Sequence, residues 1–577
     1  MDAARNGGKA RPAGYTYEEA QEMAKKAGER AVPTFCSMCG PTAGCGIYAF
    51  EKNGRLTGVA GMAEAPRNCG ALCPKAYASS EWLHSPERLT TPLRRTGARG
   101  DGRFEPISWD DAIGLIAGKL LEQKSKYGPE SLAILSPAAR NYKDIILRFL
   151  TVHGSPNNGH SGICHQQRTF AFNYTLGCWP LPDYAGSELI VYWGKQPVFS
   201  GPATESARQL VDAKRRGAKI MSIKPSMEAD VALADMWLAP RPGTDAALAL
   251  AMLHVVTGEG LTDKRFVGEH CYGYDRLEAH VRQYGPQWAE SITGVPADRI
   301  VEAARLYATT KAASIDLGNG VEHAPSSNDA IRAVAILIAI TGHLDRPGCN
   351  IIIDPSDTIK PRSLKRPDLF TREMVDKLVG PEFPRAFQPF MGGLSSAYYR
   401  VFDSVLTGKP YAPRAIIAPG TQPLASTRGT KNVIEALKKV EFFVTADVSR
   451  PAEMAYADIV LPTTAPYESD HPFEVYGDWL MAQDFYDTLT PEAQAAIDAR
   501  GYKMRDISGA TNADEMEMHK QSLLAYGTNV YELSDAEAKV FTQQIKPLFE
   551  EFGSKTSAYG LDILKVIYKY QGWDWTF

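Results

Sequence analysis

The chain has 577 residues, enough for several domains, and a composition typical of a globular protein. Its formal net charge of -4 argues against nucleic acid as the main partner and offers no basic face to a membrane surface. No run of about eighteen apolar residues occurs, so we expect no transmembrane segment. The polar N-terminus has neither an apolar signal core nor a twin-arginine pair, which predicts a cytoplasmic protein.

The first predicted element is a surface helix over Tyr15 to Ala31, and a dense group of cysteines follows it. Five of the nine cysteines fall within one short window, namely Cys36, Cys39, Cys45, Cys69 and Cys73. Glycines beside them allow the backbone to fold tightly around a buried ion or cluster. Pro74, directly after Cys73, resembles the Cys-Pro that closes many iron–sulfur motifs.

Three chemistries are open for these cysteines. Four thiolates on glycine-rich loops suit either an iron–sulfur cluster or a structural zinc ion. The long gap between Cys45 and Cys73 is unlike the usual short zinc knuckle, which favours the cluster. A disulfide framework is not expected in a long chain without a secretory signal.

The next predicted element is an amphipathic helix over Trp109 to Tyr127, because apolar residues recur on one side of it. The residues expected on that side are Ala112, Ile113, Ile116, Leu120 and Leu121.

Short apolar runs then alternate with helices and with loops rich in Gly, Pro and Ser. The predicted strands are Ser131–Leu135, Glu188–Trp193, Lys219–Ile223, Ala313–Leu317, Arg414–Ala418 and Phe442–Ala446, with helices near Glu205–Arg215 and Ser327–Ile340. This alternation predicts an α/β fold with doubly wound parallel sheets, whose ligands bind at the carboxyl ends of the strands. None of the loops has a G-x-G-x-x-G pattern, so a simple nicotinamide-binding domain is not indicated.

Several segments, in this order, resemble the molybdopterin oxidoreductases of the dimethyl sulfoxide reductase family. They are the cysteine segment ending in Cys-Pro-Lys, E-P-I-S-W-D-D-A at Glu105–Ala112, A-D-M-W-L-A-P-R-P-G-T-D-A-A-L at Ala234–Leu248, T-G-H-L-D-R-P-G at Thr341–Gly348 and A-D-I-V-L-P at Ala457–Pro462. The resemblance covers about residues 32–483. It implies a small [4Fe-4S] domain followed by two α/β domains that bind two molybdopterin guanine dinucleotides, which hold molybdenum or tungsten.

Carried over to this sequence, the resemblance implies that Cys36, Cys39, Cys45 and Cys73 bind the cluster. The spacing from Cys39 to Cys45 is longer than the family's usual pattern. Cys69 is then left over, and we interpret it as a core thiol. Lys75 matches the basic residue that lies between cluster and pterin in the family, where a cation suits the passage of electrons.

The family often binds its metal through one side chain about a hundred residues after the cluster. Here that segment reads H-S-G-I-C-H-Q-Q-R, so Cys164 is the candidate ligand. A soft thiolate is apt for molybdenum or tungsten. His165 and His160 lie close by in the sequence, and an imidazole there either moves protons or has a structural role.

The resemblance also implies cofactor contacts in the loops after the strands. The candidates are Trp193, Gly194, Gln196, Lys224, Pro225, Gly243, Thr244, Asp245, Gly318, Asn319, Gly320, His323, Gly420 and Gln422. The family often has Asp-Pro-Arg where this chain has Lys224 and Pro225, so an expected ribose-binding acid is missing. The pair Thr244 and Asp245 also fits a plain helix cap.

The resemblance to the family stops near Gln483, so we expect the C-terminal β-barrel domain of that family to be absent from this chain. Residues 480–568 instead resemble the C-terminal helices of solute-binding proteins of tripartite ATP-independent periplasmic transporters, through T-P-E-A-Q, E-L-S-D-A-E and K-P-L-F-E-E-F. The resulting division is an N-terminal extension (1–31), an iron–sulfur domain (32–90), a discontinuous α/β domain (91–160 and 346–483), a second α/β domain (161–345) and a helical tail (484–577).

The resemblance implies an enzyme that transfers an oxygen atom or a hydride equivalent in a two-electron reaction on a small-molecule substrate. Electrons would pass through the cluster, with an iron–sulfur electron-transfer subunit as a possible partner. Two alternatives stay open: a non-redox hydratase or transhydroxylase of the same family, and an inactive fusion that keeps only the cluster.

Overall fold

The computed structural model describes residues 14–36, 38, 44–65, 68–137, 143–161, 166–198, 203–352, 369, 371–380, 396–465 and 467–468. The chain separates into two compact units, Met1–Ser522 and Leu523–Phe577, and every described residue belongs to the first. The predicted helical tail (484–577) therefore lies outside the described residues.

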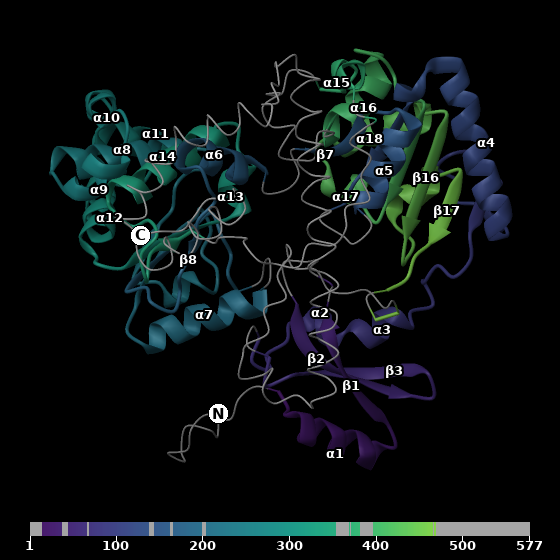
Figure 1. Cartoon of the computed structure of the whole chain (residues 1–577), viewed down its shortest axis with the longest axis horizontal. Coiled ribbons are helices and arrows are strands. Elements are labelled where there is room, and N and C mark those ends of the chain that lie inside the picture. Colours follow the sequence, from purple (N-terminus) through teal and green to yellow (C-terminus); the bar gives the residue numbers. More distant parts are fainter. Residues whose placement is uncertain are drawn as a thin grey trace, which may run out of the picture. The chain divides into compact units, whose positions relative to one another are not determined.

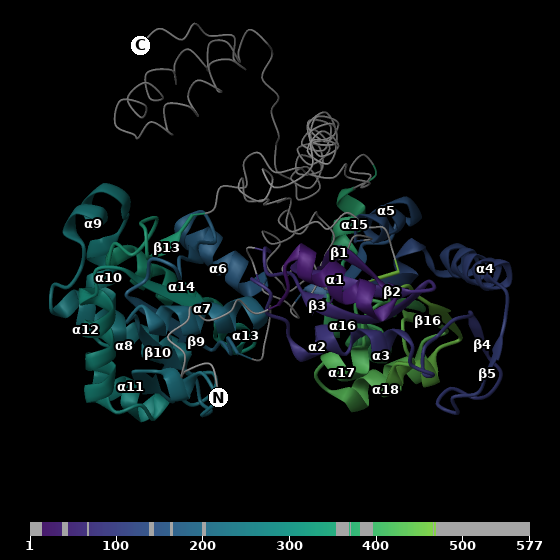
Figure 2. The ribbon, with the colours of Figure 1, turned by 90° about the horizontal axis from the view of Figure 1, so that it is seen from below.

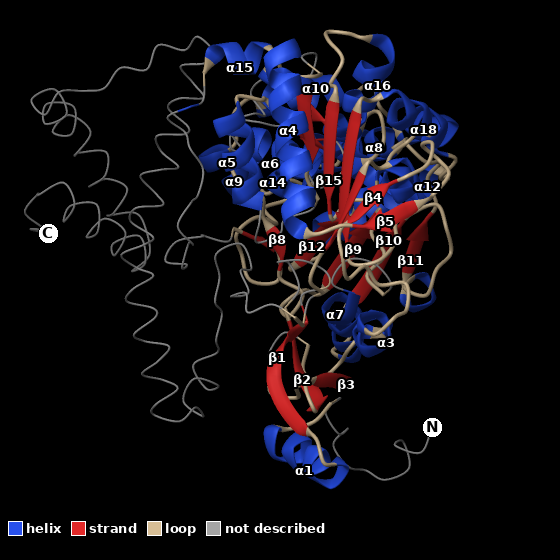
Figure 3. Ribbon diagram, turned by 90° about the vertical axis from the view of Figure 1, so that its right-hand side faces the viewer, coloured by secondary structure: helices blue, strands red, loops and turns tan. Residues whose placement is uncertain are grey.

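The described chain begins with a helix that packs on a small antiparallel sheet (Figure 2, Figure 3). Helix α1 (Tyr17–Ala27) starts at a capping box, in which Thr16 and Glu19 each accept the other's backbone N–H. Ala20 and Ala24 bury the inner side of the helix, which confirms the predicted surface helix, but its predicted end was wrong, because Arg30 and Ala31 belong to strand β1. The sheet has the order β1-β2-β3, formed by β1 (Arg30–Cys36), β2 (Cys45–Lys52) and β3 (Arg55–Gly61).

A four-stranded parallel sheet forms the core of the middle of the chain (Figure 1). Its order is β11-β10-β9-β12, from β9 (Leu189–Trp193), β10 (Lys219–Ile223), β11 (Met236–Leu238) and β12 (Ala313–Leu317). In β9, Val191 packs toward helices on one face, while Ile190 and Tyr192 pack with Leu210 and Ala213 of α7 on the other. Burial on both faces explains why these strands are continuous apolar runs. The helices are α6 (Gln166–Leu176), α7 (Ala203–Arg215), α8 (Asp245–Gly258), α12 (Ala297–Thr309) and α14 (Ser327–Ile340).

The second large sheet has eight strands in the order β14-β7-β6-β15-β16-β17-β4-β5 (Figure 1, Figure 3). The first six strands are parallel, and the last two are antiparallel. Helices α4 and α5 cover one face, whereas α16 and α18 cover the other. The elements are β4 (Leu93–Arg95), β5 (Phe104–Pro106), α4 (Trp109–Tyr127), β6 (Leu132–Leu135), α5 (Lys143–His153), β7 (Asn157–Ser161), β14 (Ser396–Ala397), α16 (Tyr398–Thr407), β15 (Ala415–Pro419), α18 (Thr430–Lys439), β16 (Phe442–Asp447) and β17 (Ile459–Pro462).

These two sheets confirm the predicted doubly wound α/β class and all six predicted strands. The remaining short elements are η1 (Pro129–Ser131), α2 (Pro74–Tyr77), α3 (Ser79–Leu83), β8 (Leu181–Pro182), η2 (Val231–Leu233), α9 (Lys264–His270), α10 (Tyr274–Val281), α11 (Pro286–Thr293), α13 (Asn319–Glu322), β13 (Asn350–Ile351), α15 (Arg372–Asp376), α17 (Pro423–Ser426) and η6 (Ala452–Tyr456).

The predicted apolar side of α4 is partly wrong. Ala112 and Leu120 are buried against the sheet, but Ile113 and Leu121 are 57% and 65% exposed. The buried residues of the helix recur about every four positions. They form a narrow stripe, because only the side of the helix that contacts the strands is buried. Ile113 and Leu121 each follow a buried residue directly and are therefore turned about 100° away from the sheet.

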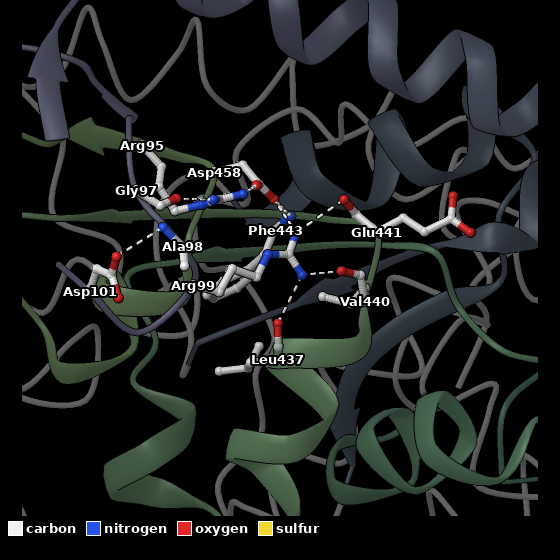
Figure 4. A network of polar contacts seen from close by, with 10 residues as sticks. All are labelled: Arg95, Gly97, Ala98, Arg99, Asp101, Leu437, Val440, Glu441, Phe443 and Asp458. Carbon is white, nitrogen blue, oxygen red and sulfur yellow. Dashed lines mark hydrogen bonds and ion pairs between the residues drawn. The ribbon is translucent and has the colours of Figure 1, made fainter. Parts of the chain in front are cut away.

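A network of arginines joins the antiparallel strands β4 and β5 to the parallel part of the sheet (Figure 4). Arg95 and Arg99 both form ion pairs with Asp458, and the Asp458 carboxylate also accepts the Phe443 N–H at 2.8 Å. Arg99 donates in addition to backbone carbonyls at the end of α18, including that of Leu437 at 2.9 Å. The side chains thus fix the edge of the sheet and satisfy carbonyls that the helix end leaves open.

Candidate functional site

Three of the four expected cluster ligands, Cys36, Cys45 and Cys73, pack in one small cluster where β1 ends and β2 begins. Cys36 and Cys45 are directly opposite each other in the β1–β2 register. Cys36 forms a small apolar cluster with Ile47 and Ala76, against which Cys45 and Cys73 pack. Cys73 directly precedes α2, so two distant parts of the sequence bring thiols to one place.

These thiols fit the soft sulfur ligands of an iron–sulfur cluster. None of the seven cysteines in the described residues is in a disulfide, so nothing there supports a disulfide framework. Within the described residues no three His, Cys, Asp or Glu side chains converge as a metal site. The fourth expected ligand, Cys39, lies outside those residues.

Two other residues of the cysteine segment, Cys69 and Lys75, lie outside the buried core. Cys69 is only partly buried, so its interpretation as a core thiol is wrong; it stands in a turn, where its N–H donates to Ala65 at 2.8 Å. Lys75 lies on the exposed side of α2, two residues after Cys73. Its role in electron passage stays a prediction.

Sequence analysis missed a tyrosine at this place. Tyr467 follows β17 and packs against the same apolar cluster as Cys45 and Cys73. Burial, and after it the neighbouring Cys36 thiol, raises the pKa of Tyr467. The two residues are far apart in the sequence, so no local pattern signals their contact.

The predicted metal ligand Cys164 and its neighbour His165 lie outside the described residues, in the segment between β7 and α6. His160, on β7, is buried, and its Nδ1 atom lies 3.3 Å from the Ser136 carbonyl oxygen. That contact gives His160 a structural role in joining β7 to the end of β6.

Three glycines form the loops at the carboxyl ends of β9 and β12. The strand order of the four-stranded sheet reverses between these two neighbouring strands. In open α/β sheets, ligands bind at such a point of reversal. The Gly318 N–H donates to Trp193 at 2.9 Å, and the Gly320 N–H donates to Gly194 at 3.0 Å. A Cβ atom at Gly318 would lie 2.2 Å from the Gly194 oxygen, so the loops approach this closely only without a side chain.

Side chains around these loops are held in ion pairs. Lys195 and Tyr184 both contact the buried Asp316 carboxylate of β12. Arg168 of α6 pairs with the buried Glu322 at 2.8 Å and also donates to Asn319 at 3.2 Å. The last predicted residue of this loop, His323, is exposed at the end of α13.

Lys224 at the end of β10 is buried, because its ammonium meets two carboxylates. It lies 2.6 Å from Asp230, which is fully buried, and 3.0 Å from Glu228. Gln196 donates to both of these carboxylates, to Asp230 at 3.1 Å. Where the resemblance led us to expect an acid, the chain thus has a lysine with two acids around it, while Pro225 is exposed.

The loop before α8 does not behave as a plain helix cap. Thr244 occupies the N-cap position, but its hydroxyl donates to the Arg241 carbonyl at 2.6 Å instead of capping. Asp245 accepts the Trp193 indole N–H at 2.8 Å, and burial raises the pKa of its carboxyl. The Gly243 carbonyl accepts from Ser326 at 3.2 Å. The Trp193 and Asp245 side chains therefore form a hydrogen bond with each other inside the protein.

A corresponding position exists in the eight-stranded sheet, between β6 and β15. The loop after β15 contains Gly420 and Gln422; the Gly420 N–H donates to the Ala446 carbonyl at 2.7 Å, and Gln422 donates to Asp447 at 3.2 Å. Behind this loop, Tyr398 and Thr421 share a hydrogen bond of 2.8 Å.

One buried acid near this second loop was not predicted. Glu453 of η6 is fully buried, and neither carboxyl oxygen has a hydrogen-bond partner in the described part of the chain. Burial raises the pKa of Glu453 to about 7, and the nearby Asp447 acts in the same direction.

The comparisons with known proteins agree with this architecture. The family described as "Molybdopterin oxidoreductase" matches residues 88–478, and "Molybdopterin oxidoreductase Fe4S4 domain" matches residues 29–85. The description "Bacterial extracellular solute-binding protein, family 7" matches residues 464–556, which confirms the resemblance of the tail.

Three similar proteins illustrate the range of the family. "Probable oxidoreductase YoaE" of Bacillus subtilis is 31% identical over 75% of this chain and 62% of its own length. "Thiosulfate reductase molybdopterin-containing subunit PhsA" of Salmonella typhimurium is 28% identical over 76% of this chain and 58% of its own. The structure of acetylene hydratase from Pelobacter acetylenicus has a TM-score of 0.67 and 27% identity, covering 74% of this chain and 62% of that one.

The chain therefore belongs to the molybdopterin oxidoreductase family, whose members are molybdopterin-dependent oxidoreductases. Membership implies a molybdopterin cofactor with molybdenum or tungsten, and a [4Fe-4S] cluster. The chain spans less than two thirds of the length of each of these three relatives. Among the described helices, none combines the length and the apolar character that crossing a membrane requires.

Proposed function

We propose that this chain is a redox enzyme that transfers an oxygen atom or a hydride equivalent to or from a small molecule, with electrons passing through the [4Fe-4S] cluster. The observation that carries the proposal is that each parallel sheet has a glycine-containing loop where its strand order reverses, at Gly194–Gly318 and at Gly420. Two such positions fit two pterin nucleotides, because ligands of open α/β sheets bind where the strand order reverses, and glycines there let a ligand approach the backbone closely.

The roles of individual residues follow from the family. Cys36, Cys39, Cys45 and Cys73 would hold the cluster, and Lys75 would assist electron passage from it. Cys164 would bind the metal. His165, its neighbour in the sequence, would transfer protons. The loop residues would bind the two pterin nucleotides: Trp193, Gly194, Gln196, Lys224, Pro225, Gly243, Thr244, Asp245, Gly318, Asn319, Gly320, His323, Gly420 and Gln422.

The bound metal would supply two-electron chemistry, and the protein would orient the substrate and exclude water. The domain division given above and a cytoplasmic location are part of the proposal. An iron–sulfur electron-transfer subunit is the proposed partner, in line with the word "subunit" in the name of the similar PhsA protein.

A non-redox hydratase is the second candidate, favoured by the similarity to the acetylene hydratase structure. In that reaction class a metal acts on water as a Lewis acid. The two candidates differ in whether substrate changes the oxidation state of the metal, which electron paramagnetic resonance before and after substrate addition would measure.

The first experiment is elemental analysis with pterin quantification on anaerobically purified full-length chain. We expect about four iron atoms, one molybdenum or tungsten, and two pterins per chain. Iron without molybdenum, tungsten or pterin would contradict the enzyme and leave the cluster-only alternative, and zinc in place of iron would contradict the cluster.

Two cysteine variants form a matched pair for this measurement. Cys36→Ala removes an expected ligand, so the iron content falls to the background level. Cys69→Ala removes the partly buried thiol of the same segment and leaves iron unchanged. Equal iron in both variants would contradict the ligand assignment.

A further inference from the structure

The chain after β17 is attached to the part of the protein that carries the cysteines. Glu468 forms an ion pair with Arg88, and its carboxylate also accepts the Ala465 N–H at 2.8 Å. Ala465 is buried and packs with Leu83 of α3 and with Val448. These contacts fix the backbone on both sides of Tyr467.

The Tyr467 hydroxyl is a buried donor with no hydrogen-bond partner in the described residues. Its ring packs against the apolar cluster of Cys36, Ile47 and Ala76, and after burial it is the Cys36 thiol, and more weakly the Cys73 thiol, that raises the pKa of the hydroxyl. The neighbouring Ser79 hydroxyl donates its own proton to the Ala76 carbonyl at 2.5 Å, so it offers Tyr467 only a neutral oxygen, which is a weaker acceptor than a charged one. Leaving a buried hydroxyl unpaired costs about 1–3 kcal/mol, so a strong acceptor is expected at this place.

A bound cluster would supply that acceptor. A neutral thiol accepts hydrogen bonds weakly, whereas a metal-bound thiolate carries negative charge and accepts strongly. The phenol keeps its proton at neutral pH, because an ordinary tyrosine ionises near pH ~10. Tyr467 therefore has the chemistry and the position of a donor to cluster sulfur.

We propose that the Tyr467 hydroxyl donates a hydrogen bond to the sulfur of Cys36 in the loaded protein and thereby raises the reduction potential of the [4Fe-4S] cluster. The inference rests on the proposed function in that it needs the cluster to be bound. Reduction adds negative charge to the sulfurs, so a hydrogen bond to them stabilises the reduced state more than the oxidised state. Tyr467 is a positioning residue in this role, because it touches a ligand and not the substrate.

The test is a redox titration of the cluster, followed by electron paramagnetic resonance, in the anaerobically purified full chain. Tyr467→Phe keeps the ring and removes the donor, so the reduced-to-oxidised ratio at a fixed potential falls about tenfold, which is about 59 mV for a one-electron couple. Tyr307→Phe is the matched control: it also removes a buried hydroxyl, but from the core of the four-stranded sheet, and it leaves the potential unchanged.

A second substitution moves the potential in the opposite direction. Placing 3-fluorotyrosine at position 467 keeps the ring and makes the hydroxyl a stronger donor, so the reduction potential of the cluster rises. The titration is done at a pH where the fluorinated phenol is still protonated. If Tyr467→Phe loses the cluster through misfolding, the sign of this second shift still decides the proposal.

The outcomes separate the inference from the proposed function. Equal iron and an equal potential in wild type and Tyr467→Phe would overturn the hydrogen bond while leaving the cluster intact. A wild-type chain without a cluster would overturn both. A lower potential in Tyr467→Phe at unchanged iron content, with a higher one for fluorotyrosine, supports the proposal.

Discussion

The two parallel sheets have the same kind of reversal in strand order but surround it with different side chains. At β9 and β12 the loops lie among buried ion pairs, such as Lys224–Asp230 and Arg168–Glu322. At β6 and β15 the polar contacts described are mostly between uncharged groups, such as Tyr398 and Thr421, and the buried acid Glu453 has no hydrogen-bond partner among the residues that the structure describes.

This difference shows that one topology does not impose one electrostatic environment. The ion-paired loops are fixed before any ligand arrives, because each buried charge already has its partner. The loops of the eight-stranded sheet depend on weaker contacts, and burial of a lone carboxyl makes their surroundings sensitive to pH. Substitutions that change one region at a time test this contrast.

The largest effect is expected where a buried ion pair loses one partner. Lys224→Met leaves the Asp230 carboxylate buried without its cation, which lowers the free energy of unfolding by about 3–5 kcal/mol. Chemical denaturation of the full chain measures this loss. Lys214→Met breaks the more exposed pair with Asp235 nearby and costs less than about 1 kcal/mol. Similar losses in both variants would show that the buried pair contributes no more to stability than the exposed pair.

The next effect is a dependence of stability on pH that Glu453 causes. Its pKa in the folded protein is raised to about 7 from 4.5, so the fold binds a proton more tightly than the unfolded chain. The stability from this group is complete below pH 4.5 and is lost as the pH rises through about 7, by about 3 kcal/mol.

Glu453→Gln isolates this contribution, since a glutamine stays neutral. Denaturation at a series of pH values should show wild type losing stability relative to the variant between these limits. Parallel curves for the two proteins would contradict the raised pKa of the buried Glu453 carboxyl.

A smaller loss of stability is expected when a side chain is added between the two glycine loops. Gly318→Ala places a methyl group against the Gly194 oxygen, and the strain costs about 1–3 kcal/mol. Thermal unfolding measures it. Gly118→Ala in α4, where the new Cβ would meet no atom within 4 Å apart from the backbone of its own helix and its chain neighbours, should instead stabilise by about 0.5–1 kcal/mol. A stabilised Gly318→Ala variant would mean that the loops are not locked together.

The smallest effect on stability is expected at Gln422. Gln422 is exposed, so Gln422→Ala loses only its bond to Asp447, at most about 1 kcal/mol. Because Gln422 is a proposed cofactor contact, the pterin content of the purified variant should fall even though its melting temperature hardly changes. Unchanged pterin content would remove Gln422 from the proposed contacts.

Local patterns predicted much of the fold, because buried parallel strands are short apolar runs with polar loops after them. The bounds of β10, β12, α4 and α14 were predicted to the residue. The exposure of Ile113 was not, since the width of the buried stripe depends on which strands lie below the helix.

The site was predictable only in part for the same reason. Cysteine spacing and glycine loops are local signals, and the structure brings Cys36, Cys45 and Cys73 together. The partners of these loops come from far along the chain: Arg168 meets Glu322 over 154 residues, and Tyr467 reaches Cys36 from after the last strand. Such contacts depend on tertiary packing, which periodicity does not encode.

The eight-stranded sheet ends on two very short strands, and this bears on how the protein behaves at high concentration. At one edge β14 has two residues, and at the other β5 has three, including Pro106, with Glu105 paired to Arg94. Exposed sheet edges are where a second molecule adds its own strand and starts an aggregate. Short edges with a proline and charged side chains offer few backbone groups for that addition, so we expect this sheet to resist edge-to-edge aggregation.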